Sequence, residues 1–407
     1  MRAYERFLKY AVIDTRSDEE CADRTPSTDR QWKLAKLLEQ EMREMGFSDV
    51  YLDEHAYAYG VIPATPGYED CRKIGFIAHI DLNSDYGEGD PKPQIIENYD
   101  GGDIVLGNSG LVIETKRFPH LAGKAGKTII TTDGTTVLGA DDKAGIAEIL
   151  TMCEELLKGE RPHGRVAVCF TPDEEIGHGA ELMDLERFGC EYGYTVDGSV
   201  PNEVEFETFN AASADWEITG FSVHPGSAKD VMINAALVAM EINAMLPAGE
   251  TPRGTEGYEG FFHLTDMSGD VSLARMGYII RDHDAEKFEV RKELLRGIER
   301  AINEKYGEGV AKLTITDQYR NMDTVICQYP EIMDKARAAI TAVGMTPVSN
   351  PVRGGTDGAE LSFRGLPCPN LGTGGYAYHG PYEHCVVEEM DSVVEILLNI
   401  VAMYAEK

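Results

Sequence analysis

The chain has 407 residues, of which 43% are hydrophobic and 27% are charged. This composition excludes the disordered and fibrous classes, and the length exceeds what one hydrophobic core usually serves, so we expect two domains. The formal net charge of −32 excludes nucleic acid and anionic membranes as partners, because the field of the protein would repel both.

The N-terminal segment, MRAYERFLKYAVIDTRS, lacks the apolar core and the cleavage site of a secretory signal. No apolar run in the sequence is long enough to span a membrane. We therefore expect a cytoplasmic protein. The eight cysteines form no Cys-x-x-Cys pair, which indicates reduced thiols that are neither disulfides nor zinc ligands.

The first elements are a helix and a strand. Residues 28–46 place apolar side chains at helical spacing, with Thr28 three residues before Gln31 and Gly46 at the end. This pattern predicts an amphipathic helix that begins with a capping box. Residues 73–81, KIGFIAHID, are apolar except at the C-terminal end, as is typical of a strand buried on both faces in a parallel sheet.

The same pattern, an apolar strand followed by carboxylates, recurs in GRVAVCFTPDEE and EYGYTVDG. A helical pattern, GADDKAGIAEILTMCEELLKGE, separates these strands from the first one. Alternating strands and helices predict an α/β domain with a mostly parallel sheet. Ligands bind beyond the carboxyl ends of such strands, which is where the polar residues gather.

After residue 212 the order of predicted elements changes to strand, helix, two strands, helix and strand. This order matches the split βαβ pattern of a small α+β sandwich. We therefore expect one domain built from residues 1–212 and 320–407, and a second domain, residues 213–319, inserted into it.

Two strand-end segments carry candidate site residues. His79 and Asp81 share one face of their strand, so His79 could bind a metal ion and Asp81 could orient the His79 ring. A structural histidine is the alternative. Asp141 and Asp142 directly precede a helix, where either one alone could simply cap it. A cap needs only one acidic residue, and two are present.

Three consecutive carboxylates, Asp173, Glu174 and Glu175, follow the next strand. Adjacent like charges are unfavourable there unless a cation or solvent is present. Their position at the expected ligand crevice favours a functional role over a solvated surface. Asp197 ends the following strand, and His379 lies in the glycine-rich loop LGTGGYAYHGPYEH, which could bend closely around a site.

Histidines and carboxylates thus converge on one sheet edge from five segments, and such nitrogen and oxygen ligands suit zinc, manganese or cobalt. Two ions about 3.5–4 Å apart need a bridging carboxylate and terminal ligands on each side. Hydrolysis needs one further carboxylate to accept a proton from water. The set supplies all of these, which predicts a site with two metal ions.

Seven segments in chain order resemble the M20 metallopeptidase family, and most closely its tripeptide aminopeptidases. They are HIDLNSD, LGADDKAGIAEI, TPDEEIGHGA, TVDG, VHPGSAK, RGGTDGAELS and YHGPYEH. The resemblance extends over nearly the whole chain. The residues after Asp81 depart from the family pattern, which puts the shape of that loop in doubt.

The resemblance implies that Asp141 bridges two zinc ions. It also implies terminal ligands, two for each ion: His79 and Asp197 for one, Glu175 and His379 for the other. In the same way, Glu174 would be the general base and Asp81 would orient His79.

In the inserted domain, the resemblance implies that His224 stabilises the oxyanion and that Asn234, Arg281 and Arg353 bind the substrate. It further implies a homodimer in which the inserted domain serves as a lid or in dimerisation. The expected activity is release of the N-terminal residue from tripeptides. Another M20 hydrolase, such as a dipeptidase, carboxypeptidase or acyl-amino-acid hydrolase, is the alternative. A catalytically silent metal-dependent binding protein is less well supported, because Glu174 is present.

Overall fold

The computed structural model describes residues 1–107 and 109–406. The chain forms two compact units. The first contains Met1–Phe206, Thr324–Asn350 and the chain from Thr356 onward, and the second contains Glu207–Asp323 and Pro351–Gly355. The second unit is therefore wider than the expected insertion of residues 213–319, because its strand β11 already begins at Asn210.

The first unit is built on a seven-stranded sheet with the order β1-β2-β8-β3-β9-β15-β10. The four central strands run parallel to one another: β8 (Val166–Thr171), β3 (Ile74–His79), β9 (Tyr192–Gly198) and β15 (Asn370–Gly372). The outer strands β1 (Asp49–Leu52), β2 (Ala58–Ile62) and β10 (Val204–Glu205) pair antiparallel. Every residue of β3 and β8 is buried, which confirms the expected α/β fold.

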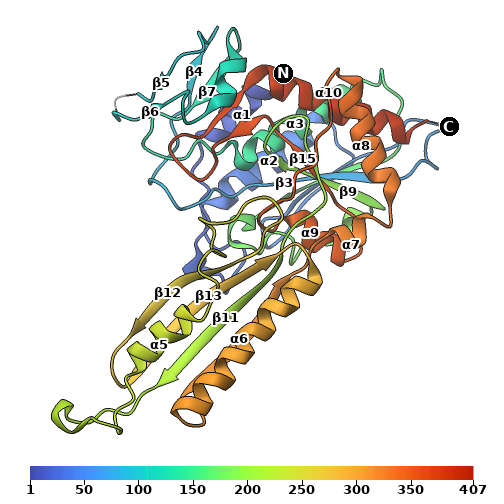
Figure 1. Ribbon diagram of the computed structural model, residues 1–407. Helices are drawn as coiled ribbons and strands as arrows, with labels where there is room; N and C mark the ends of the chain where they lie inside the picture. Colours follow the sequence, from blue (N-terminus) through green and yellow to red (C-terminus); the bar gives the residue numbers. More distant parts are fainter. Residues whose placement is uncertain (108, 407) are drawn as a thin grey trace. The chain divides into compact units, whose positions relative to one another are not determined.

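Helices cover both faces of this sheet. On one face, α3 (Ala140–Leu157) packs on β3 and β9, and α1 (Ala3–Ala11) and α10 (Val387–Tyr404) pack on α3. The first and last helices lie side by side in Figure 1. Helix α2 (Gln31–Met45) packs on β1 and β2. Helix α8 (Pro330–Ala342) packs on α10 and contacts β10. The other face is covered by α4 (Leu185–Phe188) and α9 (Asp357–Phe363). The short helices are η1 (Glu19–Cys21), η2 (Pro119–Lys124), η3 (Glu174–Ile176), η4 (Pro225–Ser227) and α7 (Asp323–Ile326).

The predicted capping box of α2 is wrong. The helix begins at Gln31, and its N-cap makes no side-chain hydrogen bond. The Thr28 hydroxyl donates instead to the Arg16 carbonyl at 2.5 Å, and the Gln31 amide donates to Asp173. Tertiary contacts thus use both side chains. At the other end Gly46 adopts the left-handed conformation, with φ of 94°, as expected of a glycine that ends a helix.

A second, antiparallel sheet of the first unit was not predicted. Its order is β16 (Gly375–Tyr376), β17 (His384–Val386), β7 (Ile129–Thr131) and β4 (Gln94–Ile96). A separate pair consists of β5 (Ile104–Val105) and β6 (Val112–Ile113). These strands have two or three residues each, too few for an alternating pattern to show in the sequence. The four-stranded sheet supports the loop that carries His379.

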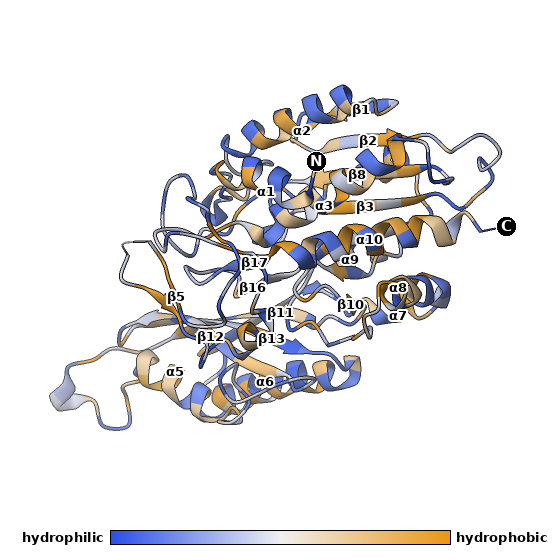
Figure 2. Cartoon of the chain, turned by 90° about the horizontal axis from the view of Figure 1, so that it is seen from above, coloured by the Kyte–Doolittle hydropathy of each residue, from blue (hydrophilic) through white to orange (hydrophobic). Residues whose placement is uncertain are grey.

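The second unit is an antiparallel sheet with the order β12-β13-β11-β14. The strands are β11 (Asn210–Thr219), β12 (Phe261–Gly269), β13 (Leu273–Asp282) and β14 (Ala311–Tyr319). Helices α5 (Ala235–Ala244) and α6 (Ala285–Tyr306) pack on it, and Trp216, Met276 and Leu295 contribute to the shared core. This confirms the split βαβ prediction. Hydrophilic and hydrophobic colours alternate along α6 in Figure 2, and its buried residues recur every three or four positions, from Phe288 to Ile302, as expected of a helix with one buried face.

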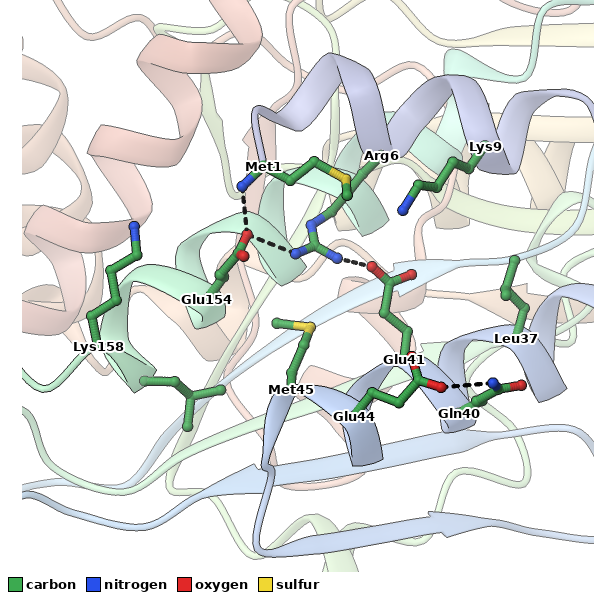
Figure 3. A pocket seen from close by; sticks show the side chains of 11 residues that line it. Met1, Arg6, Lys9, Leu37, Gln40, Glu41, Glu44, Met45, Glu154 and Lys158 are labelled. Carbon is green, nitrogen blue, oxygen red and sulfur yellow. Dashed lines mark hydrogen bonds and ion pairs between the residues drawn. The ribbon is translucent and has the colours of Figure 1, made fainter.

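Buried ion pairs tie three helices of the first unit together. Arg6 of α1 is only 2% exposed and pairs with Glu41 of α2 and with Glu154 of α3. These residues are part of the lining of a pocket of about 580 Å³, shown in Figure 3. We assign the pairs a structural role, because a buried guanidinium needs partners that satisfy its charge. None of the helices in the described part of the chain is both long and apolar enough to cross a membrane.

Candidate metal centre

Five separate segments of the first unit bring the predicted ligands together. His79 ends β3, Asp197 lies near the end of β9, and Glu175 lies in η3 directly after β8. Asp141 stands at the start of α3, and His379 lies in the loop between β16 and β17. The carboxyl ends of parallel strands meet at one sheet edge, so the fold itself assembles this set.

Asp141 lies at the centre of the arrangement. Its Oδ1 is 2.8 Å from His79 Nε2, and its Oδ2 is 3.2 Å from His379 Nε2. The same His79 nitrogen is 3.5 Å from Asp197 Oδ1, and the same His379 nitrogen is 3.2 Å from Glu175 Oε2. Two ligand groups with atoms inside 4.8 Å, His79–Asp141–Asp197 and Asp141–Glu175–His379, therefore share Asp141.

The charges at this edge suit cations. Burial raises the pKa of Glu174 and Glu175 well above the usual range, and it raises the pKa of Asp197 to about 6. Burial acts the same way on Asp141, but hydrogen bonds from His379 and His79 outweigh it and hold its pKa low. Glu175 Oε1 is buried without a hydrogen-bond partner in the described chain. Divalent cations would balance this carboxylate charge, and the nitrogen and oxygen donors fit zinc.

Asp81 has a wider role than the sequence predicted. It is fully buried, and its Oδ1 lies 3.3 Å from His79 Nδ1. Its two carboxylate oxygens also accept the backbone N–H groups of Glu174, at 3.0 Å, and of Glu175, at 3.2 Å. The hydrogen bond of His79 Nδ1 is made with the Asp81 backbone carbonyl, at 3.2 Å. The Asp81 carboxylate thus lies beside the histidine ring and holds the turn that presents two site glutamates.

Asp141 and Asp142, the two neighbouring acids at the start of α3, make different contacts. Asp142 accepts the backbone N–H groups of His79 and Gly145, each at 3.2 Å. It is therefore the residue that caps the helix. Asp141 faces the two histidines instead. Capping, which the sequence offered as the alternative to metal binding, is therefore the role of Asp142 and not of Asp141.

Glu174 lies beside the two ligand groups without belonging to either of them among the described residues. Its Oε2 is 3.9 Å from His79 Nε2. Burial favours the protonated form of its carboxyl group. Position and pKa together suit a group that accepts a proton and later returns it.

The predicted oxyanion residue His224 and the predicted substrate residue Asn234 stand at helix starts in the second unit. His224 is exposed, and its Nδ1 accepts the Gly226 N–H at 3.1 Å. Asn234 accepts the Leu237 N–H at 3.2 Å and so caps α5. The cap engages the Asn234 side-chain oxygen and leaves its amide group for other contacts.

The two predicted arginines lie at the same end of the second unit's sheet. Arg281 of β13 pairs in register with Phe261, and the Arg353 guanidinium lies 5.6 Å from the centroid of the Phe261 ring. Arg281 donates to the carbonyls of Ala212 and Ile280. Arg353 donates to three oxygens within residues 255–259. These hydrogen bonds fix the direction of both side chains.

Two residues at the metal centre were missed by the sequence analysis. Asn83 Nδ2 lies 3.2 Å from Glu175 Oε2 and 3.3 Å from His379 Nδ1. The departure from the family pattern after Asp81 was the only signal that pointed to it. Asp357 accepts the Thr171 hydroxyl at 2.8 Å, and burial raises its pKa to about 7. Nothing in its local sequence predicts that contact.

An α/β domain that gathers two histidines and two carboxylates around a shared aspartate at one edge of its sheet defines a class, the hydrolases that use two metal ions. Residues 138–403 match the model of peptidase family M20/M25/M40. A peptidase T of Alkaliphilus oremlandii is 49% identical over 405 residues, which are 99% of each chain. The chain therefore belongs to the M20 metallopeptidases and, within them, to the peptidase T group.

Solved structures share the fold. An aminopeptidase PepT from Bacillus cereus superimposes with a TM-score of 0.79 at 22% identity, covering 100% of this chain and 98% of that one. A tripeptidase from Staphylococcus aureus gives 0.77 at 20% identity with the same coverage. A dinuclear metal-binding M20 peptidase from Bacillus subtilis gives 0.66 at 15% identity, covering 100% and 99%. At these identities the likeness shows the fold alone.

Proposed function

We propose that this chain is a dizinc aminopeptidase that releases the N-terminal residue of tripeptides. The observation that carries the proposal is the pair of ligand groups that share Asp141. The 49% identity to a peptidase T over 99% of both chains supports the substrate class. Manganese or cobalt would fit the same donors.

The residues of the chain divide the work. Two bound ions would polarise the scissile carbonyl and make a water molecule more acidic. Glu174 takes a proton from that water and delivers it to the departing amine, while Asp81 keeps His79 in one orientation. His224 donates a hydrogen bond to the oxyanion that develops on the carbonyl. Loss of any one of these groups would slow the reaction without changing its course.

Arg281 and Arg353 account for the preference for tripeptides. Their planar guanidinium groups suit a carboxylate, which they bind through paired charge-assisted hydrogen bonds, and Asn234 adds a polar contact. An extended peptide lengthens by about 3.3 Å per residue. A carboxylate moved by one residue would therefore leave hydrogen-bond reach of an anchor set for a tripeptide.

A series of alanine peptides tests this function. We expect kcat/KM to be highest for Ala-Ala-Ala, with free alanine and Ala-Ala as products. Amidation of the C-terminus should lower kcat/KM by about 10- to 100-fold, the usual worth of hydrogen bonds to a charged group. Ala-Ala and Ala-Ala-Ala-Ala, assayed in the same zinc-loaded preparation, provide the controls for length. Equal rates for the acid and its amide, or a preference for Ala-Ala, would point to another hydrolase of the family.

We also propose that the chain is a cytoplasmic homodimer in which the inserted unit serves as lid and dimerisation element. The second unit supports this proposal through its open sheet edges, β12 and β14, which can pair with another copy. Light scattering on an active preparation should give the mass of two chains, and the mass of one chain would contradict the dimer. Cell fractionation tests the location.

A further inference from the structure

Glu383 is a buried carboxylate that joins two ligand-bearing segments of the metal centre. Its residue is only 1% exposed. One oxygen accepts the backbone N–H groups of Leu138, at 2.7 Å, and of Gly139, at 3.0 Å, and the other accepts the N–H of Asp141, at 3.1 Å. Glu383 follows His379 by four positions in the same loop. A single side chain therefore connects the backbone of Asp141 to the segment that carries His379.

The backbone at the start of α3 needs such an acceptor. Leu138 and Gly139 precede α3, and Asp141 precedes the residue that caps the helix, so the N–H groups of these three residues lie outside the regular helical hydrogen bonds. Gly139 lies in the left-handed region, with φ of 79°, and makes no side-chain cap, while Asp141 has a non-helical ψ of 104°. Regular helical hydrogen bonds thus do not hold this turn. A charged acceptor of three N–H groups is a strong substitute, since charge-assisted hydrogen bonds are about twice as strong as neutral ones.

We propose that Glu383 is a positioning residue of the metal centre, which holds the carboxylate of Asp141 at the place where it can serve both ions. The inference rests on the proposed two-metal function of the site. A bridging ligand must satisfy two ions at once, so a small displacement of its backbone weakens both. Residues that orient metal ligands from behind are worth about 10- to 100-fold in metal affinity.

A purely structural role would give a different result. A helix cap that serves only the stability of the domain stabilises the metal-free and the zinc-loaded protein equally. A positioning role acts mainly on the loaded protein. Loss of a positioning residue therefore reduces the rise in melting temperature that zinc produces, because that rise depends on the ratio of zinc concentration to Kd. The difference between the two melting temperatures separates the two roles.

The test uses the full chain carrying Glu383→Gln, which replaces one acceptor oxygen by an amide N–H group that faces the backbone donors. We expect the Kd for zinc, measured by competition with a chelator, to rise about 10- to 100-fold. The zinc-induced rise in melting temperature should shrink accordingly. Glu388→Gln is the matched control. Its carboxylate accepts the Thr128 backbone N–H and contacts no metal ligand, so Kd and the zinc-induced shift should stay at the wild-type values.

A wild-type Kd in folded Glu383→Gln would overturn the inference. Should that variant not fold, Glu383→Asp keeps the charge on a side chain too short to reach all three donors, and it should show the same loss of affinity. If both variants lose their fold with and without zinc alike, the residue serves the whole domain and the inference also fails. A wild-type protein that binds no zinc would instead contradict the proposed function, so the two failures are distinguishable.

Discussion

Replacing Asp141 by Ala is expected to release both metal ions and to abolish peptide hydrolysis. Each oxygen of this carboxylate faces a different histidine, at 2.8 Å and 3.2 Å, so its removal takes one ligand from each ion. Asp197→Ala should loosen chiefly one ion, because Asp197 belongs to one ligand group alone. Metal content per chain, measured on dialysed protein, checks both expectations.

Asp142→Asn is the matched control for that variant. Asp142 is the adjacent acid, but it caps the helix through the Gly145 N–H, and asparagine caps helices about as well as aspartate. Asparagine keeps one acceptor oxygen for the backbone N–H groups of Gly145 and His79, so we expect this variant to lose far less metal and far less activity than Asp141→Ala. Two tightly bound ions in the Asp141 variant, or loss of both in the Asp142 variant, would reverse the roles assigned to the two residues.

Glu174→Gln is expected to keep both ions and the fold while losing about 10²- to 10⁴-fold in kcat, the usual contribution of a positioned acid or base. Glu174 lies 3.9 Å from His79 Nε2 and outside both ligand groups in the described chain. Glutamine keeps its shape but cannot accept the proton. Metal analysis, melting temperature and single-substrate kinetics would be compared with those of the wild type.

Glu181→Gln provides a control from the same loop. Glu181 pairs with His178 at 2.9 Å, and its side chain is 59% exposed, so its charge should not matter for the reaction. Near wild-type kcat in Glu174→Gln with intact metals would place the base elsewhere. A matching loss in both variants would show that the loop, and not the carboxylate of Glu174, is responsible.

The long apolar strands made the fold predictable. Residues 74–79 and 166–171 are buried throughout, so their composition alone identifies central strands of a parallel sheet. The small sheet around β7 and β17 could not be predicted, because strands of three residues carry no periodic signal. The capping box at Thr28 failed for a similar reason. Its side chain forms a tertiary hydrogen bond to Arg16 that no local pattern reveals.

At the metal centre the ligands could be predicted from the sequence, whereas the residues that support them could not. Its ligands stand at strand ends and in a glycine-rich loop, positions that the sequence reveals. The groups that support them act across the fold. Asn83 reaches Glu175 and His379, 92 and 296 positions away, and Glu383 reaches the backbone of Asp141, 242 positions away. Contacts of this kind depend on how the loops pack, which no local spacing encodes. The sequence also could not decide which of Asp141 and Asp142 caps the helix. The hydrogen bond from the Gly145 N–H assigns the cap to Asp142.

Zinc titration of the metal-free enzyme, with Ala-Ala-Ala that carries an isotope label in its N-terminal residue alone, is the direct test of the two-metal site and of the end from which alanine is released. The two ligand groups that share Asp141 predict that activity is absent without metal. They further predict that activity reaches its plateau at two zinc ions per chain, with alanine released from the N-terminus. Full activity without metal, a plateau at one ion with no second site detectable by calorimetry, or release of alanine from the C-terminus would contradict the account.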